Sequence, residues 1–406
     1  MVYYNFQKHK EFLFLDLVVY LIPFSIILGN LILNTILLIA ILLFFILILR
    51  KNKIFTDYKN YFYFLFFLIA YLLINLFLST NFNKSAISIL GFIRYYLLFL
   101  IILFCFENIS NFKKVFTNII FFLIIFVVLD VLYQHFFLAD IFGYEVSESH
   151  GRRLSGPFGD EGVAGSFISK LFFLSLLSFY KNNFAKRLIF PIIILTIITV
   201  ILTNERSASI MFLGGALIFF LFYKTNFFYK FTLFGLGILL IVILFNLNNN
   251  LKSHFIEIPI KFFKDNHHKA HFLTSYEIFK DNKIFGSGIK TFRYVCSEDK
   301  YSKINTKYAS NRCATHPHNI YLEILSEVGL VGFSVIILVN FYILFFLIFN
   351  FFKKNDFNHE ILLLFSSFFI LFWPLQTTGA FFSTWNGIFY WIFFSYFFSF
   401  KKKLTI

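Results

Sequence analysis

The sequence predicts an all-α polytopic membrane protein. Of its 406 residues, 59% are hydrophobic and 68 are phenylalanine. Mainly apolar runs of about 17 to 22 residues, the length that a helix needs to cross a bilayer, recur along the chain. Basic residues gather in alternate connections between these runs, as in membrane proteins. Together these observations exclude an ordinary soluble domain.

About twelve transmembrane helices are expected, and the flanking charges orient them. If the N-terminus is cytoplasmic, the cytoplasmic connections hold 18 lysines and arginines, whereas the short connections on the other side hold four. Because short cytoplasmic loops carry the positive charge, both termini are predicted to be cytoplasmic. The net charge of +15 then follows from topology, and no nucleic-acid partner is expected. The expected spans are 13–29, 31–49, 61–79, 87–106, 115–137, 163–180, 188–203, 209–223, 231–247, 329–350, 361–377 and 385–399.

Arginines mark the outer connections. Arg152 and Arg153 stand in a glycine-rich segment ahead of the sixth span, and Arg206 lies in a tight turn between the seventh and eighth spans. A guanidinium offers a planar fork of donors that suits phosphate oxygens, although an interfacial arginine can also simply snorkel. With Arg293 of the next long connection, these residues form a candidate cationic cluster on one face.

The longest outer connection, residues 248–318, is basic and contains predicted helices. It holds 12 lysines and arginines against 6 acidic residues, so it should attract anions. Residues 255–264 form an amphipathic segment suited to the membrane surface, and a second helix is expected at residues 272–280. The GxG at residues 286–288 is a predicted turn and not a nucleotide fingerprint, because no strand precedes it.

Two cysteines of this connection bracket 16 residues. In an oxidising periplasm Cys296 and Cys313 can form a disulfide just before the histidines, and two unpaired thiols are the alternative. Their spacing matches no compact zinc pattern, so no metal site is predicted.

Polar chemistry is concentrated where this connection returns to apolar sequence. His316 and His318 flank Pro317, a residue that suits the first turn of a helix. A neutral imidazole can take a proton from an attacking hydroxyl, whereas a histidine at a membrane interface can also be an amphipathic cap. His318 is therefore a candidate catalytic base.

The residues that follow are spaced as on one helical stripe. Asn319, Glu323 and Glu327 recur every four residues, and the carboxylates either support the histidines or form the wet face of the helix. Gly329 and Gly332 are expected to let the chain bend or approach a neighbour closely as it enters the tenth span.

The pattern of His318-Asn319, nine residues, Gly329, two residues and Gly332 resembles the signature of the O-antigen ligase and O-antigen polymerase superfamily of membrane glycosyltransferases. Segments at 152–161, 202–208, 276–296 and 372–382 are similar to segments of that superfamily, in the same order. The resemblance implies three parts. They are residues 1–150 with five spans, an O-antigen ligase-like domain at 151–385 that includes periplasmic loop 248–318, and residues 386–406 with the last span and a cytoplasmic tail.

The resemblance implies a GT-C-like bundle in the bacterial inner membrane with a periplasmic active site. Such enzymes transfer a glycan from an undecaprenyl diphosphate carrier to an acceptor hydroxyl with inversion, without a cofactor or an obligatory metal ion. The family's essential histidine corresponds to His318, its turn arginine to Arg206, and an arginine of its earlier loop to Arg153. Several relatives carry an arginine where this chain has His271, so Arg293 or His271 is expected to supply a third diphosphate contact.

The resemblance favours ligation of O-antigen to lipid A-core. O-antigen or exopolysaccharide polymerisation and protein O-oligosaccharide transfer use the same residues and stay open as alternatives. A polysaccharide transporter or flippase is the alternative from a different functional class. It fits less well, because transporters place substrate groups near the middle of the bilayer.

Overall fold

The computed structural model describes residues 13–146, 153–179, 183–261, 265–353 and 359–405. Within these ranges the regular structure is helical, apart from one isolated bridge between Ala139 and Glu145. Six helices are long and apolar enough to cross a membrane by length and composition, and five shorter apolar helices accompany them. The chain is therefore a multi-pass membrane protein, as predicted, whereas the count of twelve spans stays a prediction.

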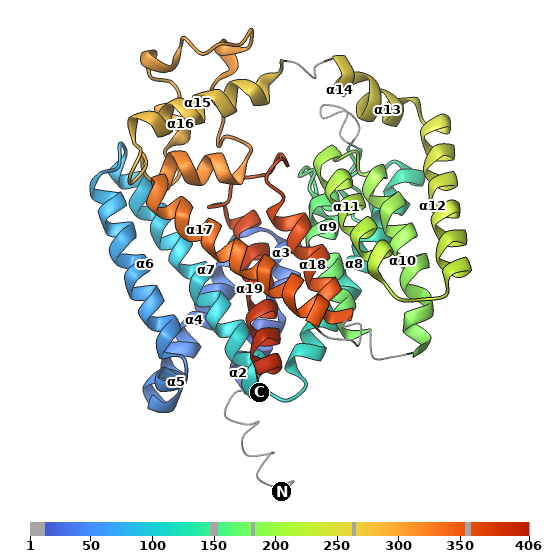
Figure 1. Ribbon diagram of the computed structural model, residues 1–406, viewed down its shortest axis with the longest axis horizontal. Coiled ribbons are helices and arrows are strands. Elements are labelled where there is room, and N and C mark those ends of the chain that lie inside the picture. The colour runs from blue at the N-terminus through green and yellow to red at the C-terminus, as the bar shows by residue number, and fades with distance from the viewer. Residues whose placement is uncertain (1–12, 147–152, 180–182, 262–264, 354–358, 406) are drawn as a thin grey trace, which may run out of the picture. The chain divides into compact units, whose positions relative to one another are not determined.

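The helices divide between two compact units, neither of which is a continuous stretch of sequence (Figure 1). Unit 1 contains α2 (Leu13–Tyr20), α3 (Ile22–Leu28), α4 (Asn30–Arg50), α5 (Asn52–Asp57), α6 (Lys59–Phe77), α7 (Phe82–Asn108), α15 (His267–Asp281), α16 (Phe292–Val295), the larger part of α17 (Ile320–Lys353) and α19 (Thr384–Thr405). Unit 2 contains α8 (Phe112–Phe137), α9 (Ala164–Ser175), α10 (Asn183–Leu202), α11 (Arg206–Phe222), α12 (Phe227–Leu247), α13 (Asn249–Lys252), the π-helical turn η3 (Ser253–Glu257), α14 (Ile258–Lys261) and α18 (His359–Phe372). The three-part division of the sequence stays a prediction.

Helix α7 is the centre of unit 1. Its residues 95–105 are apolar or aromatic and all buried, as expected for a helix that is hydrophobic on every side. Helix α19 packs along it: the rings of Tyr96 and Trp391 meet edge-on with centroids 5.5 Å apart. The Ser395 hydroxyl also donates a hydrogen bond to the Phe99 carbonyl oxygen at 3.2 Å. Helices α4 and α6 also pack against α7.

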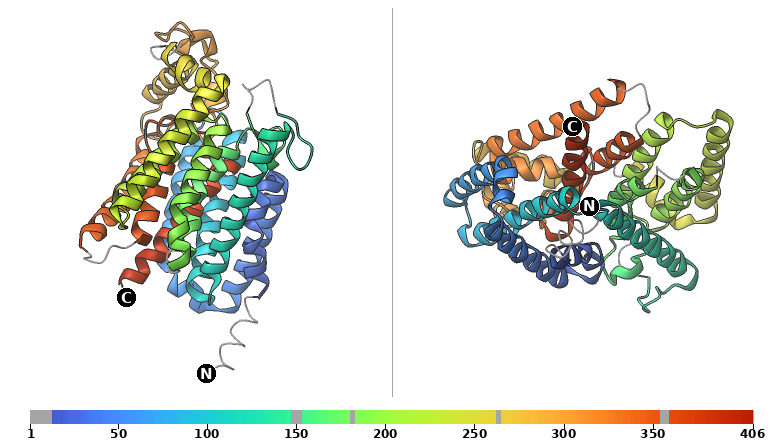
Figure 2. Two further views of the ribbon diagram at one scale, coloured as in Figure 1. Left: turned by 90° about the vertical axis from the view of Figure 1, so that its right-hand side faces the viewer. Right: turned by 90° about the horizontal axis from the view of Figure 1, so that it is seen from below.

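Glycines bring two helices of unit 2 close together. A Cβ at Gly214 would meet the ring of Phe369, and one at Gly215 would lie 2.7 Å from Cδ1 of Ile370. Small residues of this kind let membrane helices approach closely, so α11 packs tightly on α18. Helices α10, α11 and α12 run side by side (Figure 2), and α12 buries none of its own residues. It is therefore the peripheral helix of this group.

Several helix boundaries differ from the predicted ones, and three of them bear on the candidate site. Helix α15 begins at His267, five residues early, because Asn266 caps it by accepting a hydrogen bond from the backbone N–H of Lys269 at 3.0 Å. Helix α17 begins at Ile320, so the predicted span start is instead a kink at Gly329. Helix α18 ends at Phe372, and residues 373–383 are irregular. Of the predicted surface segment, residues up to 261 are helical, and 262–264 lie outside the described residues.

Candidate active site

His318 lies in a short segment between Pro317 and the start of α17. The side-chain oxygen of Asn319 caps this helix by accepting hydrogen bonds from the backbone N–H groups of Tyr321 and Leu322, at 3.0 and 3.1 Å. Pro317 therefore precedes the helix, and its predicted place in the first helical turn is wrong. His318 has a φ of 59°, in the left-handed region that histidine tolerates better than most residues. The cap and this conformation together fix the backbone that carries the imidazole.

A segment close to the C-terminus completes the histidine loop. The backbone N–H of Thr378 donates to the carbonyl oxygen of His318 at 2.8 Å, and Nε2 of His316 lies 3.1 Å from the carbonyl oxygen of Thr378. The side-chain amide of Asn319 donates to the carbonyl oxygen of Pro374 at 2.7 Å. His316 therefore joins two segments, and the loop conformation depends on both.

Two histidines of α15 join His318. His268 and His271 stand three residues apart, so both project from one face of the helix. Their ring centroids lie 5.1 and 5.2 Å from that of His318, and the ring of His316 lies 4.2 Å from it on another side. Burial lowers the pKa of His318 to about 3, with the neighbouring imidazoles adding to the effect, and burial also lowers the pKa of His271 and His316. These three imidazoles are therefore neutral near pH 7.

Two carboxylates of α17 bind loop backbone in unit 1. Glu323 and Glu327 are each only 1% exposed, so the alternative that they form the wet face of the helix is wrong. Glu327 accepts hydrogen bonds from the backbone N–H groups of Lys290 and Phe292, at 2.7 and 3.1 Å. Glu323 accepts one from the backbone N–H of Phe381 at 2.7 Å. Each carboxylate thus fastens a loop to the helix that His318 precedes.

The glycines of the motif allow the predicted close approach. At Gly329 the helix is interrupted, with φ of 66° and ψ of −169°. A Cβ there would meet the backbone of Ile284 and Gly286, so a larger residue would push these segments apart. The backbone N–H of Gly332 donates to the hydroxyl of Tyr71 on α6 at 3.2 Å. The bend and the close contact predicted for these two positions are both present.

A disulfide joins the end of α16 to the segment that leads into the histidines. It links Cys296 to Cys313, whose Cα atoms are 5.3 Å apart, and Nε of Arg312 donates to the carbonyl oxygen of Cys296 at 2.8 Å. Arg293 on α16 is exposed, and its charge adds to burial in lowering the pKa of His316. Within unit 1, the structure therefore brings Arg293 toward the histidines.

The other predicted arginines belong to unit 2. Arg206 is the first residue of α11, and Arg153 lies near enough for the two charges to interact. Nε of Arg153 is buried and has no hydrogen-bond partner among the described residues. Burial, followed by these two charges, lowers the pKa of His254 to about 4. Two guanidinium groups with an unpaired donor suit an anion. Arg152 lies outside the described residues, and a grouping of Arg293 with this pair stays a prediction.

Glu205 holds the turn that carries Arg206. Its side chain is 8% exposed and accepts hydrogen bonds from the backbone N–H of Gly165 and the hydroxyl of Ser166, both at 2.6 Å. These donors belong to the first turn of α9, where a carboxylate is favourable. The turn between α10 and α11 is thus anchored to α9, which fixes the backbone of the arginine.

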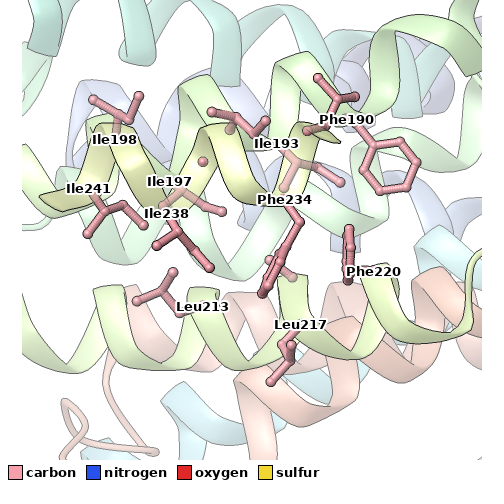
Figure 3. A pocket seen from close by; sticks show the side chains of 14 residues that line it. Phe190, Ile193, Ile197, Ile198, Leu213, Leu217, Phe220, Phe234, Ile238 and Ile241 are labelled. Carbon is pink, nitrogen blue, oxygen red and sulfur yellow. The ribbon is translucent and has the colours of Figure 1, made fainter. Parts of the chain in front are cut away.

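Unit 2 also encloses an apolar pocket of about 230 Å³ between α10, α11 and α12 (Figure 3). Phe190, Phe220 and Phe234 gather at one end, and Ile198 and Ile241 lie toward the other (Figure 3). The rings of Phe220 and Phe234 stack with centroids 4.5 Å apart. Every lining residue is apolar or glycine, so the pocket suits hydrocarbon.

Sequence reasoning missed several residues beside the predicted ones. His268 carries a recoverable signal, since it stands three residues before His271 in a polar helix. Lys290 and His254 are separated by many residues from the groups that they approach, and no local pattern marks them. The role of Glu205 depends on a contact with a helix 40 residues earlier. Only tertiary structure reveals such contacts.

The comparison with protein families identifies the same region of the chain. Residues 191–337 match the family model described as O-antigen ligase. The match includes Arg206, the histidine cluster, and the motif from His316 to Gly332, whereas Arg153 precedes it. Among curated proteins, none matches the chain. The match at residues 191–337 therefore supports the O-antigen ligase superfamily for this part of the chain.

Proposed function

We propose that the protein transfers a glycan from an undecaprenyl diphosphate carrier to an acceptor hydroxyl on the periplasmic face of the bacterial inner membrane. The observation that carries the proposal is His318: inside the matched domain, a neutral imidazole stands in a loop fixed by a helix cap and by a second segment. Ligation of O-antigen to lipid A-core is the preferred reaction, since O-antigen ligase is the description that the domain matches.

The arginines of unit 2 bind the diphosphate of the donor. Arg153 and Arg206 repel each other, and Nε of Arg153 has no hydrogen-bond partner among the residues described, so a dianionic group relieves both costs. The same charges stabilise the negative charge that develops on the leaving diphosphate.

The apolar pocket of unit 2 receives the polyprenyl chain of the donor. Helix α11 begins with Arg206 and lines the pocket from Leu213 onward. Seven residues of helix separate the two positions, which corresponds to roughly 10 Å. A carrier with its diphosphate at Arg206 therefore reaches the pocket with the first part of its hydrocarbon chain. The pocket's wholly apolar lining supports this occupant over a polar one.

His318 acts on the acceptor. Its neutral imidazole accepts a hydrogen bond from the acceptor hydroxyl and takes the proton as the oxygen attacks the anomeric carbon. The new glycosidic bond forms as the bond to the phosphate oxygen breaks, with inversion at that carbon. Undecaprenyl diphosphate leaves with the bonding electrons, and no metal ion takes part.

Two substitutions test the assignment. In purified protein supplied with undecaprenyl diphosphate-linked glycan and lipid A-core, His318→Ala and Arg206→Ala should each lower the transfer rate by at least about 100-fold, the scale of a lost acid–base or oxyanion-stabilising group. The control is His267→Ala, because His267 is exposed at the start of α15. Transfer at the wild-type rate by either variant would contradict the role proposed for that residue.

The products distinguish ligation from polymerisation. Deleting the gene should remove the long O-antigen bands from lipopolysaccharide while lipid-linked polymer accumulates. If the deletion instead leaves lipopolysaccharide capped with single repeats, the enzyme is a polymerase of the same superfamily.

A further inference from the structure

The imidazoles of His268, His271 and His318 form a compact nitrogen cluster in unit 1. One ring nitrogen from each lies within 4.8 Å of the other two. Tetrahedral zinc with nitrogen ligands at 2.0–2.1 Å needs ligand atoms about 3.4 Å apart. The rings therefore need to approach one another by only roughly an ångström, which small side-chain rotations supply.

The backbone holds these rings in place without a ligand. His268 and His271 stand in the first two turns of α15, whose start is fixed by the Asn266 cap. Asp265 strengthens this start by accepting hydrogen bonds from the Thr306 hydroxyl at 2.6 Å and from the Lys307 N–H at 3.0 Å. His318 is fixed independently by the segment that contacts its backbone. Donors on two rigid elements form a preorganised site.

His271 gives an independent indication of a ligand. Its side chain is 7% exposed, and its Nδ1 is buried without a hydrogen-bond partner among the described residues. Its ring is also hydrogen-bonded to the backbone of Asn311. An unpaired buried nitrogen is costly. A ring with one nitrogen bonded to a backbone group and the other left without a partner is the arrangement that a metal-ligating histidine needs.

His316 is not part of the ligand set. Its Nδ1 lies 2.8 Å from the Thr315 hydroxyl and its Nε2 lies 3.1 Å from the Thr378 carbonyl oxygen, so both ring nitrogens are engaged. Three imidazoles then leave a fourth coordination position for water. All-imidazole donors suit Zn²⁺, Co²⁺, Ni²⁺ and Cu²⁺, whereas Mg²⁺ and Ca²⁺ prefer oxygen.

We propose that His268, His271 and His318 bind one divalent transition-metal ion, with Zn²⁺ as the preferred probe, and that the bound ion inhibits glycan transfer. The ion occupies the ring nitrogen with which His318 would accept a proton. Metal binding is a property beyond the proposed function, because the transfer reaction needs no metal. Only the inhibition rests on that function.

Binding is measured first, without reference to activity. Full-length protein in detergent, stripped with a chelator and returned to metal-free buffer, is titrated with Zn²⁺ by calorimetry and with Co²⁺ by visible absorption. We expect one ion per chain and the intense bands of tetrahedral Co²⁺. His268→Gln and His271→Gln should each weaken binding by more than about 100-fold, at least the loss seen when a metal's supporting residues are removed. His267→Gln, one residue from the cluster, should bind as the wild type does.

The outcomes separate this proposal from the proposed function. Absence of stoichiometric binding, or equal affinity in wild type and His268→Gln, overturns the metal site. In the transfer assay, Zn²⁺ should inhibit the wild type but not His268→Gln, when each protein is compared with itself in metal-free buffer. Equal inhibition of both overturns the regulatory part. If no transfer occurs in any sample, the proposed function fails while the binding measurements still decide the site.

Discussion

Glu327 fastens unit 1 together with both its side chain and its backbone. The carboxylate accepts hydrogen bonds from the N–H groups of Lys290 and Phe292. Its carbonyl oxygen accepts bonds from the N–H of Gly288 at 3.0 Å and the side-chain amide of Asn75 at 2.9 Å. One residue thus connects α6, α17 and the loop before α16. A buried acid with this many partners is a positioning residue for the loops around the histidines.

Replacing Glu327 by alanine should destabilise the protein. Two backbone N–H groups lose their acceptor, which costs about 1 to 3 kcal/mol for each unsatisfied buried group. Unfolding of the purified variant in detergent, followed by intrinsic fluorescence, measures the loss. Glu277→Ala is the matched control, since Glu277 is exposed in an ion pair with Lys280, and its effect should stay within about 0.5 kcal/mol. Equal stabilities of the two variants would contradict the positioning role.

For single residues, the sequence predicts the position on a helix better than it predicts burial or hydrogen-bond partners. The spacing of Asn319, Glu323 and Glu327 correctly placed the two acids on the helix, but it could not show that both are buried. Their partners are backbone groups of residues 290, 292 and 381, which no side-chain pattern reveals. His318 can be predicted as a candidate because its motif is local, and its catalytic role stays a proposal.

Among the elements, the kinked helix α17 decides how the loops of unit 1 pack. Gly329 interrupts it with a positive φ at the point where the backbone of Ile284 and Gly286 comes closest. The two parts of the helix thereby serve different purposes. The first part carries the buried acids, and the second is almost wholly apolar, as a membrane span requires.

Gly329→Ala should separate these segments. The φ of 66° and ψ of −169° at Gly329 lie in a region that is almost exclusive to glycine, so an alanine there costs about 1–3 kcal/mol. Its Cβ would also collide with backbone atoms that cannot move aside easily. We expect a lower unfolding temperature and faster cleavage of the 282–290 segment by protease. Gly235→Ala in α12 is the control, because a Cβ at Gly235 meets nothing within 4 Å and should leave both measurements unchanged. A Gly329→Ala variant that behaves like this control would show that the kink is dispensable.

Element boundaries were predictable only where the signal was hydrophobic. Each of the twelve expected spans overlaps a helix, because the length of an apolar run can be read directly from the sequence. The early start of α15 depends on the Asn266 cap, and the early end of α18 leaves a segment that bonds to the histidine loop. Polar contacts of this kind override the apolar pattern at helix ends.

For the whole molecule, the division into two units follows contacts that run far along the chain. Helix α15 belongs with α7, and α18 belongs with α9, although long stretches separate each pair. The sequence alone suggested consecutive parts, and that division stays a prediction. Each compact unit instead combines separate stretches of the chain. Charge distribution, in contrast, gives a prediction at this scale without any knowledge of packing.

Both chain ends should face the cytoplasm. Lysines 401–403 lie at the C-terminal end of α19, and positive charge at the end of a span marks the cytoplasmic side. A green fluorescent protein fused after residue 406 should fluoresce, and alkaline phosphatase at the same position should be inactive. Phosphatase inserted after Asn250 should be active, because residues 248–318 are expected on the outer side. The reverse pattern would invert the topology and move His318 to the cytoplasm.

The contacts of residues 374–381 also determine when the histidine loop is complete during synthesis. Thr378 supplies both backbone partners to the loop, Pro374 accepts from Asn319, and Phe381 donates to Glu323. A growing chain that has reached only Phe372 already contains every histidine and arginine of the candidate sites. It lacks the segment that holds the loop, so the order of translation makes this conformation one of the last to form.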